Sequence, residues 1–501
     1  MKKYILTTVL SVLFITPLFA QTDFTWTNGN GSNTWSDDGN WHAGAAPTNS
    51  DDVVFDGNYS NDDCTLDGLG AEAYSITIQN GYSGIITLTN NTSLSVGDGG
   101  ITIAASGFSG KIEIETDNSI TTPFFSVANN VANNSMTLTV AGSLYTGNFQ
   151  MPRGTANAGS AQNFEVDASA YGGSSGGFNI ASCTFTAPSG ELLINVVGSG
   201  TLSGLSSGSF NANGGTVKVY FAANKNLPSG YTGTNGFNNL TITLNAITNR
   251  TITIPANIDV KGNLVLVSSS TNYLHFGGSG TNLNLYKNLD LTDFNATGGS
   301  GSSQATSPNI NLVGNTQQKI IGNSDLTKEG GLLPTLVINQ ASGGTIQFEK
   351  RVNLGRSLKI ESNGSITCTS NSVIGFLSGF SNETISGATT LTNLDLKDLI
   401  INKSGKSVSL SSFTPNIRIS GVMTIPAGTY NTNNQLIFRS TSNSASGQLG
   451  EVSGTLSGNA TVERFIAGAT GRKWRFLASP ITTSNYRSRY RRKLCNGYQK
   501  L

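Results

Sequence analysis

An internal repeat of 63 residues constrains the fold of this chain more than any other feature of its sequence. The repeat is clearest over residues 308–370 and recurs over 372–433, so that Leu336-Val337-Ile338-Asn339 corresponds to Leu399-Ile400-Ile401-Asn402. Each copy contains short runs in which apolar and polar residues alternate, the pattern of half-buried β-strands. Such an array forms an elongated scaffold, because each unit buries its apolar face against its neighbours.

A shorter spacing inside the array matches the turn of a parallel β-helix. Corresponding strands lie 24 residues apart from Leu336 to Ile360 and 27 apart from Ile76 to Ile103. We therefore predict an all-β chain folded as a right-handed parallel β-helix, or β-solenoid. About sixteen turns stacked ~4.8 Å apart would make a rod of roughly 80 Å. A tandem array of small β-sandwich modules, one per 63 residues, is the alternative, since alternation within strands suits both architectures.

The composition agrees with short strands joined by tight turns. Of 501 residues, 60 are glycine and only 12% are charged, and no helical period is found outside the N-terminal segment. Gly and Asn tolerate the positive φ angles that tight turns require. We expect the β-repeat array of about 63-residue units over 214–460 and an irregular β-solenoid over 71–213. An insertion over roughly 270–305 lengthens one unit of the array.

The first 20 residues have the features of a secretory signal peptide. Lys2 and Lys3 give a positive start, Tyr4–Leu18 is apolar, and Leu18-Phe19-Ala20 forms the cleavage site. The apolar run is too short to anchor the chain in a membrane, and no other stretch is long enough. The sequence therefore predicts a secreted or cell-surface protein with no membrane-spanning segment in the mature chain.

Residues 21–70 form a region rich in tryptophan and aspartate. Trp26, Trp35 and Trp41 lie within sixteen positions, and we expect them to form an aromatic cap over the open end of the array. The alternative role is a stacking platform for sugar rings, which makes the three tryptophans the candidate ligand-binding residues. Aspartate oxygens of the same region can bind Ca²⁺ in an extracellular protein, although no complete EF-hand loop is present. These aspartates are Asp37, Asp38, Asp51, Asp52, Asp56, Asp62, Asp63 and Asp67.

The chain lacks the residue patterns of the enzyme classes that share its expected fold. Its two histidines, His42 and His275, stand outside any Gly-His-Gly turn, and no Gly-x-Ser-x-Gly elbow on a strand–helix turn or phosphate-binding loop accompanies them. The four cysteines, Cys64, Cys183, Cys368 and Cys495, have no metal-ligand spacing and no readable disulfide framework. We therefore expect a non-catalytic protein with no catalytic residues, no metal site and no cofactor other than the Ca²⁺ considered above.

The charge of the chain is distributed unevenly. Residues 464–501 carry ten of the 30 Lys and Arg residues and no acid, which leaves a net charge of −9 for the residues before them. An acidic body offers no electrostatic footprint for nucleic acid, so no nucleic-acid partner is expected.

Several segments resemble a known group of proteins. The run Ile310-x-Leu312-x-Gly314, continued by Ile320-x-Gly322 and Leu336-x-Ile338-Asn339, is similar to repeats of large secreted and surface adhesin-like β-solenoid proteins. These proteins belong to Gram-negative bacteria that use the type IX secretion route, and the Trp-rich start is similar to their amino-terminal region. The resemblance implies a secreted or outer-membrane-associated protein whose partners are extracellular glycans or other cell-surface components.

The carboxyl end departs from that group, whose members continue into further β domains and a sorting domain. Residues 461–480, with Lys473-Trp474-Arg475-Phe476, resemble the start of a further β domain, but 481–501 form a basic tail without the β pattern. The tail is explained by truncation or a frame shift, by a disordered basic tail, or by an arm for nucleic acid or anionic surfaces.

The sequence is consistent with two functions. The first is a secreted or cell-surface structural and adhesive β-repeat protein without catalytic activity. The second is a glycan-binding or polysaccharide-degrading β-helix protein.

Overall fold

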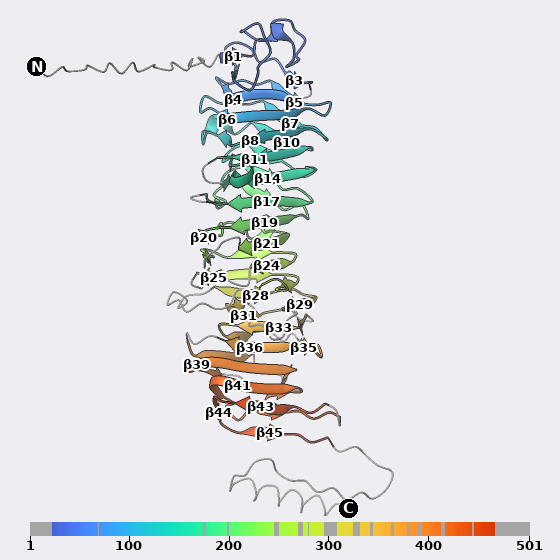
Figure 1. Ribbon diagram of the computed structural model, residues 1–501, viewed down its shortest axis with the longest axis vertical. Coiled ribbons are helices and arrows are strands. Elements are labelled where there is room, and N and C mark those ends of the chain that lie inside the picture. The colour runs from blue at the N-terminus through green and yellow to red at the C-terminus, as the bar shows by residue number, and fades with distance from the viewer. Residues whose placement is uncertain are drawn as a thin grey trace, which may run out of the picture.

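The computed structural model is a rod of stacked β-coils that begins at the tryptophan-rich region and ends near residue 465 (Figure 1). It is nearly all β, with 54% strand and 3% helix. The structure describes residues 23–465 except 69, 174–176, 198–199, 245–249, 269–273, 279, 295–307, 324–330, 341–343, 362–364, 378–380, 388–392, 412–415 and 443–444.

Each coil places one strand on each of three faces before the chain returns above its starting point. Ile76–Ile78 lies on the first face, Ile86–Leu88 on the second and Leu94–Val96 on the third, after which Ile101 pairs in parallel with Ile76. Further coils follow at a similar spacing along the sequence; in the next coil, for example, Phe125 pairs with Ile101. The alternating pattern produces this arrangement since apolar side chains point into the coil and polar ones point out.

The strands of the three faces and the short helices have the following bounds. First face: β1 Asp23–Thr25, β2 Asp52–Asp56, β9 Phe125–Val127, β12 Phe149–Gln150, β15 Phe178–Asn179, β20 Lys225–Asn226, β22 Arg250–Thr253, β25 Leu274–Gly277, β30 Leu332–Leu333, β33 Arg351–Leu354, β36 Val373–Leu377 and β43 Gln448–Val452. Four longer strands span two faces: β4 Ala71–Gln79 and β6 Ser93–Ile103 begin on the third face and end on the first, and β39 Asp398–Leu410 and β41 Val422–Asn431 begin on the first face and end on the second. Second face: β3 Cys64–Leu66, β5 Ile85–Leu88, β7 Lys111–Ile114, β10 Thr137–Val140, β13 Thr155–Asn157, β16 Thr184–Thr186, β18 Ser209–Asn211, β23 Ile258–Val260, β26 Asn282–Leu285, β28 Asn309–Leu312, β31 Thr335–Ile338, β34 Leu358–Ile360, β37 Glu383–Gly387 and β44 Thr455–Ser457. Third face: β8 Ser119–Thr122, β11 Ser143–Thr146, β14 Asn163–Asp167, β17 Glu191–Val196, β19 Thr216–Phe221, β21 Asn239–Leu244, β24 Leu264–Ser268, β27 Leu289–Asp290, β29 Gln317–Ile321, β32 Thr345–Glu349, β35 Ser365–Cys368, β38 Asn393–Leu396, β40 Asn416–Ile419, β42 Leu436–Phe438 and β45 Ala460–Val462. Helices: η1 Asp38–Asn40, η2 Val131–Asn133, α1 Ala168–Tyr171 and η3 Gly233–Asn235.

The prediction of a right-handed parallel β-helix is confirmed, and the alternative of sandwich modules is wrong. Strands pair in parallel along each face, as β17 does with β19 and β31 with β34. Sandwich modules would instead pair neighbouring strands in antiparallel fashion. About 15 coils are present, which at ~4.8 Å each gives a rod of roughly 70 Å.

The coil, and not the 63-residue unit, is the structural repeat. Leu336 pairs with Leu358 on the second face, whereas Leu399 lies on the first face and pairs with Met423. Residues 63 positions apart therefore resemble each other without stacking on each other. Strands and turns follow a similar sequence pattern on all three faces. Two segments with similar sequences can therefore lie on different faces, and the length of the sequence repeat need not equal a whole number of coils.

One further sequence expectation differs from the structure. Much of the expected insertion at 270–305 is a regular part of the stack, because β26 and β27 pair with the coils on either side. Within residues 71–213, whose register the sequence does not reveal, neighbouring strands pair in parallel, as Leu138 does with Ile112. Their strands are short and separated by Gly-Ser turns, which hides the register in the sequence.

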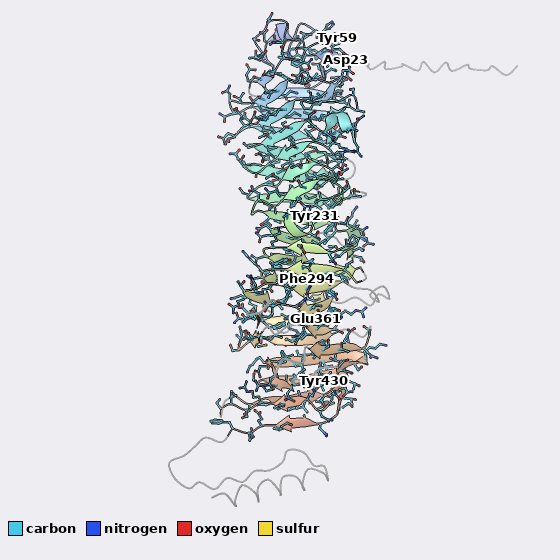
Figure 2. All side chains as sticks on the ribbon, turned by 180° about the vertical axis from the view of Figure 1, so that it is seen from behind. Asp23, Tyr59, Tyr231, Phe294, Glu361 and Tyr430 are labelled. Atoms are coloured by element: carbon cyan, nitrogen blue, oxygen red, sulfur yellow. The ribbon has the colours of Figure 1, made fainter. Side chains whose placement is uncertain are left out.

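One continuous apolar core runs inside the rod. Aromatic rings of successive coils stack within it, with centroids 5.5 Å apart for Phe125 and Phe149 and 5.6 Å apart for Phe149 and Phe178. Offset stacking of this kind adds to the burial of apolar area. Each coil is therefore stabilised mainly by its two neighbours. Asp23 lies at the N-terminal end of the rod and Tyr231 near its middle (Figure 2).

The ends of the chain fall partly outside the described residues. The expected signal peptide (1–20) and basic tail (481–501) lie outside them, as does Trp474. Residues 460–462 form β45, which pairs with β42 of the solenoid, so the start of the expected further β domain at 461 is the last described strand of the stack. None of the helices in the described part of the chain is long and apolar enough to cross a membrane.

Candidate functional site

The three tryptophans form a closed aromatic cluster in the first coils. Trp41 lies between the other two, with ring centroids 5.1 Å from Trp26 and 4.8 Å from Trp35 and interplanar angles of 70° and 76°. Phe55 of β2 packs against all three indoles at 6.1 to 6.4 Å. Edge-to-face contacts of this kind are the favoured geometry of aromatic pairs.

The indoles are buried, and the N–H groups of Trp26 and Trp41 donate hydrogen bonds inside the protein. Trp26, Trp35 and Trp41 are 0%, 4% and 2% exposed. Trp41 Nε1 donates to the carbonyl of Trp35 at 2.8 Å, and Trp26 Nε1 donates to the carbonyl of Asp62 at 3.2 Å. No ring face of these tryptophans is open to a sugar, so stacking on a glycan would first require the cluster to open.

The region of the tryptophan cluster belongs to the solenoid itself. β1 pairs in parallel with β2, and β2 pairs with β4 of the following coil. The backbone from Trp26 to Trp41 folds over the end of the core and closes with an antiparallel bridge between those two residues. This is the position at which a solenoid needs its core covered.

The aspartates of this region serve turns and hydrogen bonds. Asp37 caps η1 and accepts hydrogen bonds from Ser32, Asn30 and Gly39, which lowers the pKa of its carboxyl below the ordinary value. Asp67 accepts from Ser36. Within the described residues, no group of three or more His, Cys, Asp and Glu side chains is placed to hold a metal ion.

Other residues considered for chemistry are dispersed. His42 is exposed beside the tryptophan cluster, and His275 belongs to β25 about halfway along the rod. Cys64 and Cys183 are buried and Cys368 is half-buried, and all three are free thiols; burial raises the pKa of Cys183 to about 12. The described residues thus bring no histidine beside a cysteine that could act as a nucleophile.

A polar groove on the first face is a feature that sequence reasoning missed. It lies at β20 and β22, which are about halfway along the rod (Figure 1). Its volume is about 490 Å³. It is lined by Thr201, Leu202, Asn224, Lys225, Asn226, Thr251 and Thr253.

Three successive coils supply the lining of the groove. Lys225 of β20 pairs with Ile252 of β22, which brings Thr251 and Thr253 alongside it. Asn224 Oδ1 accepts a hydrogen bond from the backbone N–H of Thr251 at 2.9 Å and fixes one wall. The ammonium of Lys225 donates to the carbonyl of Gly200 in the coil before, and burial lowers its pKa below the ordinary value of 10.5.

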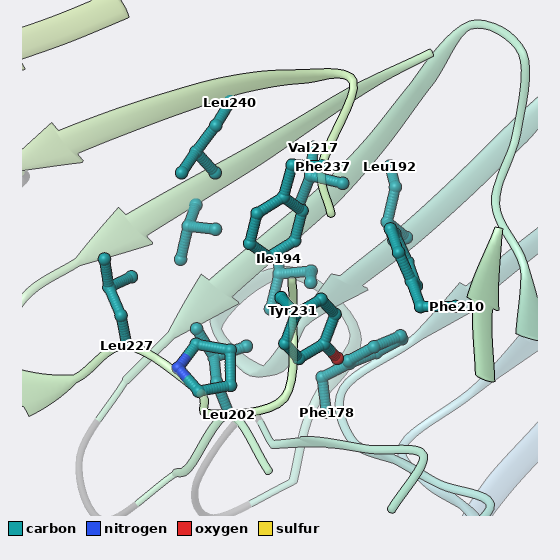
Figure 3. A pocket seen from close by; sticks show the side chains of 12 residues that line it. Phe178, Leu192, Ile194, Leu202, Phe210, Val217, Leu227, Tyr231, Phe237 and Leu240 are labelled. Carbon is teal, nitrogen blue, oxygen red and sulfur yellow. The ribbon is translucent and has the colours of Figure 1, made fainter. Parts of the chain in front are cut away.

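The interior beside the groove is apolar and nearly full. Leu202, which lines the groove, also lines a space in the core with Leu227, Tyr231 and Phe178 (Figure 3). That space is about 10 Å³, close to the smallest volume that holds one water molecule. Tyr231 stacks on Phe237 with centroids 4.6 Å apart, and burial raises the pKa of its hydroxyl. A ligand larger than a water molecule therefore has room in the groove but not in this space in the core.

One feature of the sequence, a long stretch without acidic residues, coincides with the groove. Residues 192–258 contain no Asp or Glu but include Lys218, Lys225 and Arg250, in a body that is otherwise net acidic. The convergence of Thr201, Lys225 and Thr251 depends on which strands stack, and the spacing alone does not reveal it.

Comparison with known proteins gives no relative. No protein-family model, no curated protein and no solved structure matches the chain.

Proposed function

We propose that the protein is a secreted or cell-surface structural and adhesive protein, without catalytic activity, that presents its solenoid to extracellular glycans or other cell-surface components. The observation that carries this proposal is the stack of about 15 coils on one apolar core. Such a stack makes a stiff spacer, because every coil is fixed by its neighbours along the whole length.

The outward positions support the same role. Along the coils they are occupied largely by Thr, Ser and Asn, as in Thr241 and Thr243 of β21, which suits contact with a hydrated, hydroxyl-rich surface. The resemblance to adhesin-like proteins of the type IX secretion route points the same way. We therefore propose that the protein acts outside the cell, in association with the outer membrane or released from it.

The proposal is tested with a panel of neutral and acidic polysaccharides incubated with the full chain. Binding is measured by biolayer interferometry, and new reducing ends and unsaturated ends are measured in the same mixtures. We expect binding without new ends. Turnover of any polysaccharide would instead favour a polysaccharide-degrading β-helix protein and overturn the non-catalytic assignment.

The proposed location has a separate test in the cells that produce the protein. An antibody against the solenoid is applied to intact cells and to the culture medium, before and after brief treatment with an external protease. We expect the antigen on the surface or in the medium. Detection only after cell lysis would contradict the proposed location.

A further inference from the structure

We infer that the groove formed by Thr201, Leu202, Asn224–Asn226, Thr251 and Thr253 binds a segment of an anionic polysaccharide, with a carboxylate or sulfate group facing Lys225. The inference rests on the proposed function, since it names the class of glycan and the place where the glycan is held.

The size and position of the groove fit a short stretch of a polymer. Its volume of about 490 Å³ falls in the range of roughly 300–1,000 Å³ that is usual for ligand sites. It is an open depression on the side of the rod and not an enclosed cavity, so part of a longer polymer can lie in it. The groove crosses three coils, from Thr201 to Thr253, and therefore extends along the rod.

The described lining of the groove offers mainly hydrogen-bonding groups. Hydroxyl groups of Thr201, Thr251 and Thr253 can both donate and accept, and the amide of Asn226 adds further donors and an acceptor. Such groups match the hydroxyls of sugar rings. The described lining residues therefore favour a polar or charged ligand over an apolar one.

The charge around the groove selects an anion. Lys225 lies in the wall, and Arg250 begins β22 next to Thr251. No Asp or Glu occurs anywhere from residue 192 to residue 258. A cation in a partly desolvated groove attracts an anion more strongly than it would in water. The rest of the net-acidic body would repel the same polymer, so the attraction is confined to this part of the rod.

The partial burial of Lys225 agrees with a recognition role. Its ammonium is held against the carbonyl of Gly200 and so is fixed at the wall of the groove. An anion within hydrogen-bond reach of this ammonium forms a charge-assisted hydrogen bond with it. Uronate and sulfate groups share this chemistry, and the experiment below distinguishes them.

The experiment measures binding of the full-length chain to four polymers at low and at physiological salt. The polymers are polygalacturonate, a sulfated galactan, an uncharged galactan and single-stranded DNA of similar length. We expect a dissociation constant for one of the two acidic glycans at least tenfold below that for the uncharged galactan, and weaker binding as salt rises. The better of the two identifies carboxylate or sulfate as the preferred group.

Two variants in the groove and two matched controls locate the site. Lys225→Gln removes the cation, and Thr253→Asp places a carboxylate in the groove. Lys261→Gln removes an exposed lysine after β23, and Thr241→Asp makes the same change on the third face. We expect each groove variant to weaken acidic-glycan binding about tenfold, the effect of losing one charge-assisted hydrogen bond. Each control should stay within about twofold of the parent chain, and equal melting temperatures verify that all four are folded.

The outcomes separate this inference from the proposed function. If acidic glycans bind but Lys225→Gln and Thr253→Asp bind them as well as the controls do, the groove assignment is overturned and an adhesive function stands. If DNA binds as tightly as the glycans with the same dependence on Lys225, the groove is a general polyanion site and the inference fails. If no polysaccharide or cell-surface component binds the parent chain, both proposals fail.

Discussion

Lys403 is a lysine whose side chain is buried inside the rod, whereas most lysines of proteins lie at the surface. It lies in β39 and is 0% exposed. Its ammonium approaches the carbonyl oxygens of Gly355 and Leu377, each at 3.4 Å, which belong to the two preceding coils. Burial lowers the pKa of Lys403 to about 8, with the nearby Arg356 acting in the same direction and Glu383 opposing it. The side chain thus links three coils and places a charge inside the rod, close to Arg356 and Glu383.

The stability of the chain should therefore depend on pH in a way that Lys403→Met removes. The pKa of Lys403 is about 8 in the folded state and 10.5 for an ordinary lysine, so the unfolded chain binds more protons between these two values. Stability rises with pH wherever the unfolded state binds more protons. The free energy of unfolding of the parent chain should thus increase relative to that of the variant from pH 8 to 10.5, by on the order of 3 kcal/mol.

Urea unfolding of the parent chain and of Lys403→Met at pH 7, 8, 9 and 10 checks this expectation. Lys261→Met, which makes the same change at an exposed position, is the matched control. A constant difference for Lys403→Met would show that the ammonium is solvated in the folded state.

At the scale of structural elements, the tryptophan-rich region singled out in the sequence is a cluster of three indoles in mutual contact. Three indoles within sixteen positions at the start of a β-array have few roles other than covering a core or meeting a ligand. Their burial at 0%, 4% and 2% exposed places them in the core. An element so rich in buried aromatic area should control the stability of the first coils.

Truncation of the central indole should unfold the end of the rod before the rest. Trp41→Ala removes a ring that contacts both other tryptophans and Phe55, and large-to-alanine changes of this kind cost about 3–5 kcal/mol. We expect an early transition at lower temperature in a thermal melt followed by tryptophan fluorescence. Trp41→Phe should shift that transition less, because most of the aromatic volume is kept.

The control for this change is Tyr59→Ala in the same region. Tyr59 is 64% exposed, so its truncation should alter stability by no more than about 0.5 kcal/mol. A single unchanged transition for Trp41→Ala would mean that the cluster does not stabilise the first coils.

Register was harder to predict than the presence of strands. Alternation identified Leu336–Ile338 and Leu399–Ile401 as strands, and both are strands. Their similarity suggested equivalent places, yet they lie on different faces. Closure of the coil around the core decides which strands become neighbours. An apolar side chain that points inward is buried equally well on any of the three faces, so alternation does not reveal the face. The groove escaped prediction for the same reason, since Thr201, Lys225 and Thr251 meet only through the stacking of their coils.

At the scale of the whole molecule, the stack should tolerate the removal of one complete coil. Phe125 pairs with Phe149, 24 residues further along, and Leu144 pairs with Phe164 on the third face. Deletion of residues 125–148 would bring Phe149 onto Ile101, the present partner of Phe125. Every later strand would keep its face, and because coils interact mainly with their neighbours, the remaining interfaces should persist.

The deleted chain should be folded and shorter by about 4.8 Å, which small-angle X-ray scattering and far-ultraviolet circular dichroism can measure together. Deletion of residues 125–136 alone is the matched control. It puts Thr137, a second-face residue, at the first-face position of Phe125. Every later strand is then moved to a different face of the coil. We expect that shorter deletion to melt at a lower temperature than the full-coil deletion. If the 12-residue deletion is tolerated as well as the 24-residue one, the faces are interchangeable and the coil does not specify the register of the rod.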